Sequence, residues 1–254
     1  MDCWHRPYTR NDAIPEIQGE DISIGLSALN IGDEIHHRLS RVYRVNKEEF
    51  LAPRLFGIPL FEFVIAVVLS QNTSDKNAWR AYENLRKVLG EITPDKVIKL
   101  HPQELAELIK PAGMHNERAT RILKMARKFL ENDFEGEIKA MIEREGVEKA
   151  KETLMKLPGI GDKTADVILL MYFNKPVFPI DTHISRITRR LGYIASNRYR
   201  DIQDFWMKNT SPEKYLELHL LLISHGRKTC RPRRPLCEEC ILKDMCRFKS
   251  GAVT

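Results

Sequence analysis

The residues that decide the fold are Leu154–Gly192, LMKLPGIGDKTADVILLMYFNKPVFPIDTHISRITRRLG. At 157–161 (LPGIG) a proline fixes φ, and Gly159 and Gly161 allow positive φ and close approach to the backbone. Apolar residues at helical spacing follow over 162–173. Such a turn in front of a helix N-terminus gathers N–H groups that bind an anion such as phosphate. No Walker-type sequence follows and no strand precedes, so we predict a helix–hairpin–helix that grips a nucleic-acid backbone.

Two charged residues in this stretch occupy unusual positions. Lys163 lies in the first turn of its predicted helix, where the helix dipole disfavours a cation. Partial burial there lowers a lysine pKa and keeps some of the amine neutral, as a nucleophile requires. Asp181 is the N-cap of a second helix that ends at Gly192, so its ionised carboxylate is able to stabilise a developing cation. Taken singly, each also fits a plainer interpretation: a solvated lysine on a phosphate-binding hairpin, and an ordinary cap.

Four cysteines near the C-terminus have the spacing of metal ligands. Cys230, Cys237, Cys240 and Cys246 form the pattern C-x6-C-x2-C-x5-C. Four thiolates this close suit a tetrahedral metal or an iron–sulfur cluster. Disulfides are disfavoured, because the chain has only one other cysteine, Cys3, and no secretory signal precedes it. Zinc ribbons usually use paired C-x2-C knuckles, and one such pair is present here, so the spacing modestly favours a [4Fe–4S] cluster over zinc.

These motifs resemble those of endonuclease III, of the helix–hairpin–helix DNA glycosylase superfamily. The segments LPGIGDKTADVIL and PIDTHISRITRRLG are similar to those that carry the family's catalytic lysine and aspartate. The segment SHGRKTCRPRRPLCEECILKDMC is similar to its cluster loop, with the same cysteine spacing. LSQNTSDKNA and GMHNERA resemble its two DNA-probing loops. The resemblance covers about residues 55–248.

The resemblance implies a role for individual residues. Lys163 becomes the nucleophile, Asp181 the catalytic carboxylate, and the four cysteines the ligands of a [4Fe–4S] cluster. Gln71 becomes the side chain that enters the space left by an everted base; its plainer interpretation is a linker residue. Met114 becomes an apolar wedge against the opposite strand, where a core methionine is the alternative. The first loop has one residue more between Gln71 and Asp75 than the bacterial pattern.

The rest of the chain predicts helices and no strands, so the fold class is all-α. Residues 59–70 are almost continuously apolar and predict a buried helix, although a buried strand has the same hydrophobicity. Apolar stripes, which include Val88 and Leu130, predict helices at 75–89 and 116–131. Further helices are predicted at 32–45, 102–110, 137–144, 146–156, 199–208 and 212–225.

The resemblance also implies two lobes. A six-helix barrel with the hairpin is expected over 56–175, and an iron–sulfur cluster domain is expected from 1–55 and 176–254 together. The active site is expected in the cleft between them, where ligand sites tend to occur. Residues 1–30 show no clear pattern of their own.

Charge and hydropathy indicate the partner. A net charge of +6 and a pI of about 9.0 suit a polyanion. Five of the eight residues from 227 to 234 are basic and none is acidic; this basic run comprises Arg227, Lys228, Arg231, Arg233 and Arg234. Such a run is often a solvated face, but between cluster ligands it becomes a rigid basic finger for phosphates. Without a bilayer-spanning run or a signal peptide, we expect a cytoplasmic, nucleoid-associated monomer in a prokaryotic cell.

The resemblance to endonuclease III implies a base excision repair DNA glycosylase with AP lyase activity. Its expected substrate is double-stranded DNA with a damaged base, such as an oxidised pyrimidine, or an abasic site. Lys163 would form a Schiff base with the sugar and allow β-elimination on the 3′ side. Two alternatives remain open: a monofunctional glycosylase for mismatched or alkylated bases, in which Lys163 only contacts phosphate, and a non-enzymatic DNA-binding module with a metal staple.

Overall fold

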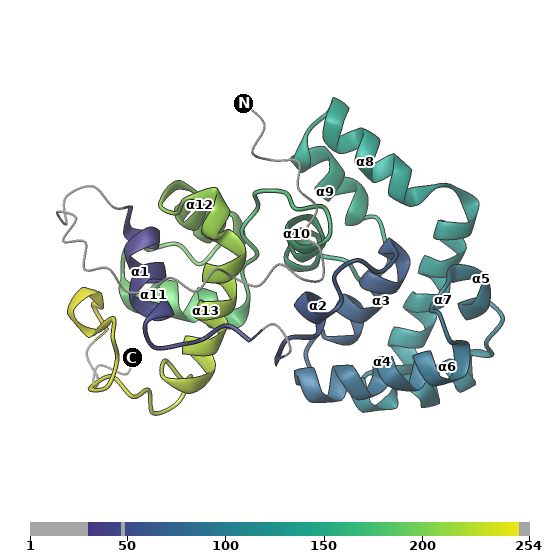
Figure 1. Ribbon diagram of the computed structural model, residues 1–254, viewed down its shortest axis with the longest axis horizontal. Helices are drawn as coiled ribbons and strands as arrows, with labels where there is room; N and C mark the ends of the chain where they lie inside the picture. Colours follow the sequence, from purple (N-terminus) through teal and green to yellow (C-terminus); the bar gives the residue numbers. More distant parts are fainter. Residues whose placement is uncertain (1–29, 47–48, 249–254) are drawn as a thin grey trace.

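A computed structural model describes residues 30–46 and 49–248; Cys3 and the other residues of 1–29 lie outside the described part. Its described residues form helices and no strand, which confirms the all-α class (Figure 1). None of these helices is long and apolar enough to cross a membrane. The α-helices are α1 (Ile31–Ser40), α2 (Leu51–Arg54), α3 (Leu60–Leu69), α4 (Asp75–Leu89), α5 (Pro94–Val97), α6 (Pro102–Ile109), α7 (His115–Glu131), α8 (Phe134–Arg144), α9 (Val147–Leu154), α10 (Asp162–Met171), α11 (Thr182–Leu191), α12 (Tyr199–Lys208) and α13 (Tyr215–Lys228). Three 3₁₀ turns are η2 (Lys110–Ala112), η3 (Pro212–Lys214) and η4 (Lys243–Met245).

The helices form two lobes with α10 between them (Figure 1). In one lobe α13 packs against α1 and α11, and α11 also contacts α12. In the other lobe α3 packs against α2, α4, α7 and α10. All ten residues of α3 are buried, as its continuously apolar sequence predicted. Its one acid, Glu62, accepts hydrogen bonds from the Tyr82 hydroxyl (2.6 Å) and from Arg86 (2.9 Å).

Most predicted helices are present, with different ends. The first ends at Ser40 rather than at residue 45, and the last divides into η3 and α13. Val88 and Leu130, which the stripes placed in the core, are 54% and 51% exposed. Both lie in the last turns of their helices, α4 and α7. Apolar spacing defines a face of a helix, but it does not say how far the neighbouring helix extends along that face.

A buried ionic group joins the two lobes. The Asp166 carboxylate on α10 is fully buried and lies 2.9 Å from the Lys151 ammonium of α9. The same oxygen accepts hydrogen bonds from two residues of α12, the Tyr199 hydroxyl (2.6 Å) and Gln203 Nε2 (2.7 Å). These partners hold the segment that precedes α11: Gln203 donates to the Phe178 carbonyl, and the Ile180 N–H donates to Tyr199. The group therefore fixes the backbone directly before the α11 N-cap.

Removing the ammonium from this group should destabilise the protein strongly. Lys151→Met leaves the buried Asp166 carboxylate without its cation, which we expect to cost about 3–5 kcal/mol of unfolding free energy. Urea denaturation followed by circular dichroism measures the change. Lys149→Met is the matched control two residues earlier, where the lysine pairs with Glu152 in full solvent. The urea midpoint of Lys149→Met should stay at the wild-type value. Equal shifts in the two variants would show that the buried Lys151–Asp166 pair stabilises the fold no more than an exposed ion pair does.

Candidate active site

The hairpin between α9 and α10 uses its two glycines differently. Gly159 has φ +85°, in the left-handed region that favours glycine. Gly161 has φ −108°, an extended conformation that any residue adopts. A Cβ on Gly161 would meet no heavy atom within 4 Å, whereas one on Gly159 would lie 2.9 Å from Cδ of Arg121. Gly161 thus leaves open space at the start of α10, and Gly159 makes room for Arg121.

A cleft of about 830 Å³ lies where the two lobes meet. Its walls come from α2, the loop after α3, the start of α4, α10, and the three helices α11–α13. The polar and charged residues in it include Gln71, Asp75, Lys163, Asp181, His219 and Arg227. The structure therefore brings the lysine and the aspartate of the opening sequence stretch into one cavity, together with the first probing loop.

The environment of Lys163 favours a neutral amine. Lys163 is half-buried in the first turn of α10, where the helix dipole also opposes its charge. Burial lowers the pKa of Lys163 below its ordinary value, and the positive charge of Arg227 lowers this pKa further. Asp181 and Asp75 oppose the shift, and Asp181 is the stronger of these two charges. The amine therefore loses its proton at a lower pH than an ordinary lysine, with a carboxylate close by.

The Asp181 carboxylate caps α11 and faces the same cleft. Its Oδ1 accepts the N–H of Ile184 at 2.8 Å, and this bond uses one of its two oxygens. Behind it, the buried His219 donates its Nδ1 proton to the Pro179 carbonyl at 3.0 Å. Burial lowers the pKa of His219 to about 4, so this imidazole is neutral at physiological pH. The fixed charges close to Lys163 are therefore Asp181, Asp75 and Arg227.

An ion pair that the sequence did not predict lies across the mouth of the cleft. Asp75, at the start of α4, lies 2.7 Å from Arg227, at the end of α13. In the loop before Asp75, Asn72 adopts φ +54°. Arg227 also lies 5.3 Å from the Phe50 ring. Arg227 thus belongs to the cleft, although the sequence grouped it with the basic run of the cluster loop.

The two predicted probing loops lie side by side. Gln71 Nε2 donates to the Gly159 carbonyl and to Thr164 Oγ1, each at 3.0 Å. Met114 is 54% exposed and has φ +50°, which excludes the core-methionine interpretation. A small space between the loops is lined by Gln71, Met114 and Arg118. The exposed apolar side chain of Met114 thus lies next to the polar side chain of Gln71 at the edge of the cleft.

The four cysteines fit an iron–sulfur cluster. Cys230, Cys237, Cys240 and Cys246 are free thiols that border one cavity. The four thiols line the same cavity, and four thiols are the donor set that a [4Fe–4S] cluster takes.

An arginine of α11 connects this cavity to the basic finger, which we define as Arg231, Arg233 and Arg234. Arg190 donates to Cys230 Sγ at 3.3 Å, to the Arg231 carbonyl at 2.7 Å and to the Pro232 carbonyl at 2.9 Å. All three side chains of the finger are exposed, and Arg234 adopts φ +52°. The finger is therefore held by the cluster loop and by α11 at the same time.

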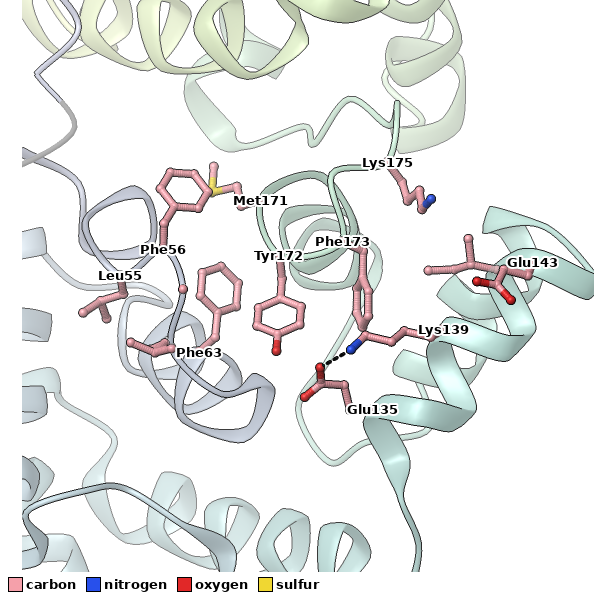
Figure 2. Close-up of a pocket in the computed structure, with 13 residues that line it drawn as sticks. Leu55, Phe56, Phe63, Glu135, Lys139, Glu143, Met171, Tyr172, Phe173 and Lys175 are labelled. Atoms are coloured by element: carbon pink, nitrogen blue, oxygen red, sulfur yellow. Dashed lines mark hydrogen bonds and ion pairs between the residues drawn. The ribbon is translucent and has the colours of Figure 1, made fainter. Parts of the chain in front are cut away.

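A second pocket, of about 430 Å³, lies between α8, the end of α10 and the segment that precedes α3. Figure 2 shows it between Phe56, the aromatic pair Tyr172 and Phe173, and the Glu135–Lys139 ion pair of α8. Met171 borders both this pocket and the cleft. None of the residues predicted to act on DNA lines this pocket, so the chemistry is assigned to the cleft.

Comparison with known proteins agrees with this geometry. Residues 65–212 match the HhH-GPD superfamily of base excision DNA repair proteins, and residues 230–246 match the iron–sulfur binding domain of endonuclease III. The chain is 37% identical to endonuclease III of Sulfolobus acidocaldarius over 87% of its own length and 97% of that protein. It is 35% identical to endonuclease III of Thermotoga maritima over 74% of its own length and 83% of that protein.

Solved structures give the same result. A trapped covalent intermediate of endonuclease III with DNA superposes with a TM-score of 0.65 at 27% identity, over 85% of this chain and 92% of that one. A non-covalent endonuclease III–DNA complex matches equally well. The chain therefore belongs to the endonuclease III family of the HhH-GPD superfamily, and it is a base excision repair DNA glycosylase with AP lyase activity and a [4Fe–4S] cluster.

Proposed function

We propose that this enzyme excises damaged pyrimidines, such as oxidised ones, from duplex DNA, with Lys163 as the nucleophile and Asp181 as its partner. The observation that carries the proposal is the position of Lys163. A half-buried lysine with a lowered pKa shares the cleft with a carboxylate whose orientation is fixed by a helix cap. A base inside a duplex is out of reach of such a cleft, so it must first be flipped out.

The reaction follows from these two side chains. The Lys163 amine attacks C1′ of the deoxyribose, and the bond from C1′ to the base breaks, so that the base leaves with the bonding electrons. The Asp181 carboxylate stabilises the positive charge that develops on the sugar and accepts a proton from the attacking amine. Opening of the sugar ring gives a Schiff base to Lys163. Loss of a C2′ proton then expels the 3′ phosphate by β-elimination, and water releases the product from the lysine.

The remaining residues bind DNA in this proposal. The open space at Gly161 and the basic finger take backbone phosphates, while Gln71 and Met114 fill the duplex at the vacated position. The four cysteines would hold the [4Fe–4S] cluster and so keep the finger in shape, and no catalytic step is assigned to the cluster. We further infer that the enzyme acts as a monomer, with 56–175 as the barrel and with 1–55 and 176–254 forming the cluster domain. Excision measured on a panel of lesion-bearing duplexes tests the pyrimidine preference.

Lys163→Gln and Asp181→Asn separate the two roles. Lys163→Gln should bind a lesion duplex but form no borohydride-stable adduct and neither excise nor cleave. Asp181→Asn keeps a capping oxygen, so we expect unfolding to change by less than about 1 kcal/mol while excision falls by orders of magnitude. Trapping, single-turnover excision and thermal melting measure these effects. An adduct in Lys163→Gln would remove the nucleophile assignment and leave the monofunctional alternative.

The Asp75–Arg227 pair should set the pH dependence of Schiff base formation. Trapping on a preformed abasic site requires neutral Lys163, so it rises as pH increases through the Lys163 pKa. Asp75 raises this pKa and Arg227 lowers it. Asp75→Asn should therefore move the rise to lower pH, and Arg227→Gln should move it to higher pH. Lys228→Gln, one residue along α13, is the control and should leave it in place. Shifts in the same direction for Asp75→Asn and Arg227→Gln would contradict this electrostatic account.

The basic finger should contribute to the affinity for DNA but not to the rate of base excision. Each arginine that neutralises a phosphate displaces counterions. Replacing Arg231 and Arg233 with alanine should therefore reduce the log–log salt slope of DNA binding by about 0.9 for each phosphate that is no longer neutralised. Damaged and undamaged duplexes should be affected alike. Single-turnover excision at saturating enzyme and the visible absorbance of the cluster should stay the same. An unchanged slope would show that the finger is solvated surface that contacts no phosphate, and phosphate binding would then be assigned to the hairpin.

A further inference from the structure

One buried guanidinium contacts both probing loops. Arg118, in the first turn of α7, is 5% exposed. Its Nε donates to the Gly113 carbonyl at 3.2 Å, and its Nη2 donates to the Gln71 carbonyl at 3.0 Å. Its Nη1 donates to the Val68 carbonyl in the last turn of α3. The donors of one side chain therefore hold the backbone of two loops that are far apart in the sequence.

Two of these carbonyls precede the strained residues of the loops. The Gln71 carbonyl belongs to the peptide unit before Asn72, which has φ +54°, and the Gly113 carbonyl belongs to the unit before Met114, which has φ +50°. Left-handed conformations are uncommon for residues other than glycine and persist where the surroundings fix them. Arg118 therefore fixes the peptide units that decide where Gln71 and Met114 project.

No acidic partner among the described residues compensates the buried positive charge of Arg118. Among the described residues Arg118 has no carboxylate within ion-pair distance, and the nearby Glu117 is paired with Arg121. Burying a cation is costly unless hydrogen bonds replace its water. Here the replacements are backbone carbonyls of the two loops. An apolar residue would fill the same position on the buried face of α7 at a lower desolvation cost, but it would donate no hydrogen bond to these carbonyls.

We propose that Arg118 is a positioning residue that makes Gln71 and Met114 a single rigid probe for base eversion. The inference rests on the proposed function, in which both side chains enter the duplex. Filling the vacated space and wedging the opposite strand must occur together, because either insertion alone leaves part of the stack open. Arg118 holds the two loops in one relative position before DNA arrives, so less ordering is needed on binding.

The test compares a substrate that needs eversion with one that does not. Arg118→Met keeps the length of the side chain and removes its donors. Single-turnover excision of a damaged base from a duplex should fall by about ten- to a hundred-fold, the range for losing hydrogen bonds to a charged group. Borohydride trapping on a single-stranded oligonucleotide with an abasic site should stay within about twofold, because nothing has to be unstacked. Lys124→Met, an exposed cation on the same helix, should match wild type on both substrates.

Two further measurements separate positioning from general damage to the fold. A lesion placed opposite an abasic site is already poorly stacked, so the defect of Arg118→Met should shrink on that duplex. Met114→Ala should reduce excision in the wild-type background and have little further effect together with Arg118→Met. If Arg118→Met does not fold, Arg118→Lys, which keeps the charge but not the fork of donors, takes its place. Equal losses on single-stranded and duplex substrates would overturn the proposal, whereas a wild-type enzyme that forms no adduct would instead overturn the proposed function.

Discussion

The active site depends on a buried carboxylate that takes no part in the chemistry. Asp166 lies three residues beyond Lys163 on α10, and its partners Lys151, Tyr199 and Gln203 come from both lobes. Through Tyr199 it also holds the backbone directly before Asp181. A buried ion pair contributes little net stability, but breaking one is costly, so it specifies a single arrangement. In this protein that arrangement sets Lys163 and Asp181 relative to each other.

A few fixed charges in the cleft then adjust the pKa of Lys163. Burial alone favours the neutral amine, and the negative charge of Asp181 limits this effect. The Asp75–Arg227 pair adds two opposing contributions that lie on different lobes. The pKa of Lys163 is therefore sensitive to how closely the two lobes approach each other, because Lys163 lies in the cleft between them.

The sequence predicted the site residues that can be recognised from their position in a helix or from their spacing along the chain. Lys163 and Asp181 could be identified because a helix N-terminus destabilises a positive charge and stabilises a negative one. The four cysteines could be identified from their spacing. The Asp75–Arg227 pair was missed because it joins residues that only tertiary packing brings together. Arg118 did leave a signal: it lies four residues before Ile122, on the buried face of its helix, where an apolar residue is expected. Asp166 left the same signal within the apolar run after Lys163.

Several arginines serve the protein itself rather than DNA. Arg118 donates to carbonyls of the probing loops, and Arg190 donates to carbonyls of the finger. Arg186 of α11 donates to the Gly226 and Cys230 carbonyls, which ties the cluster loop to the helix that Asp181 caps. A guanidinium suits this work because its planar fork reaches several acceptors at once. The net charge of +6 thus overstates the charge available to phosphates. Some of the basic character that suggested a DNA partner serves to hold in place the loops that would meet it.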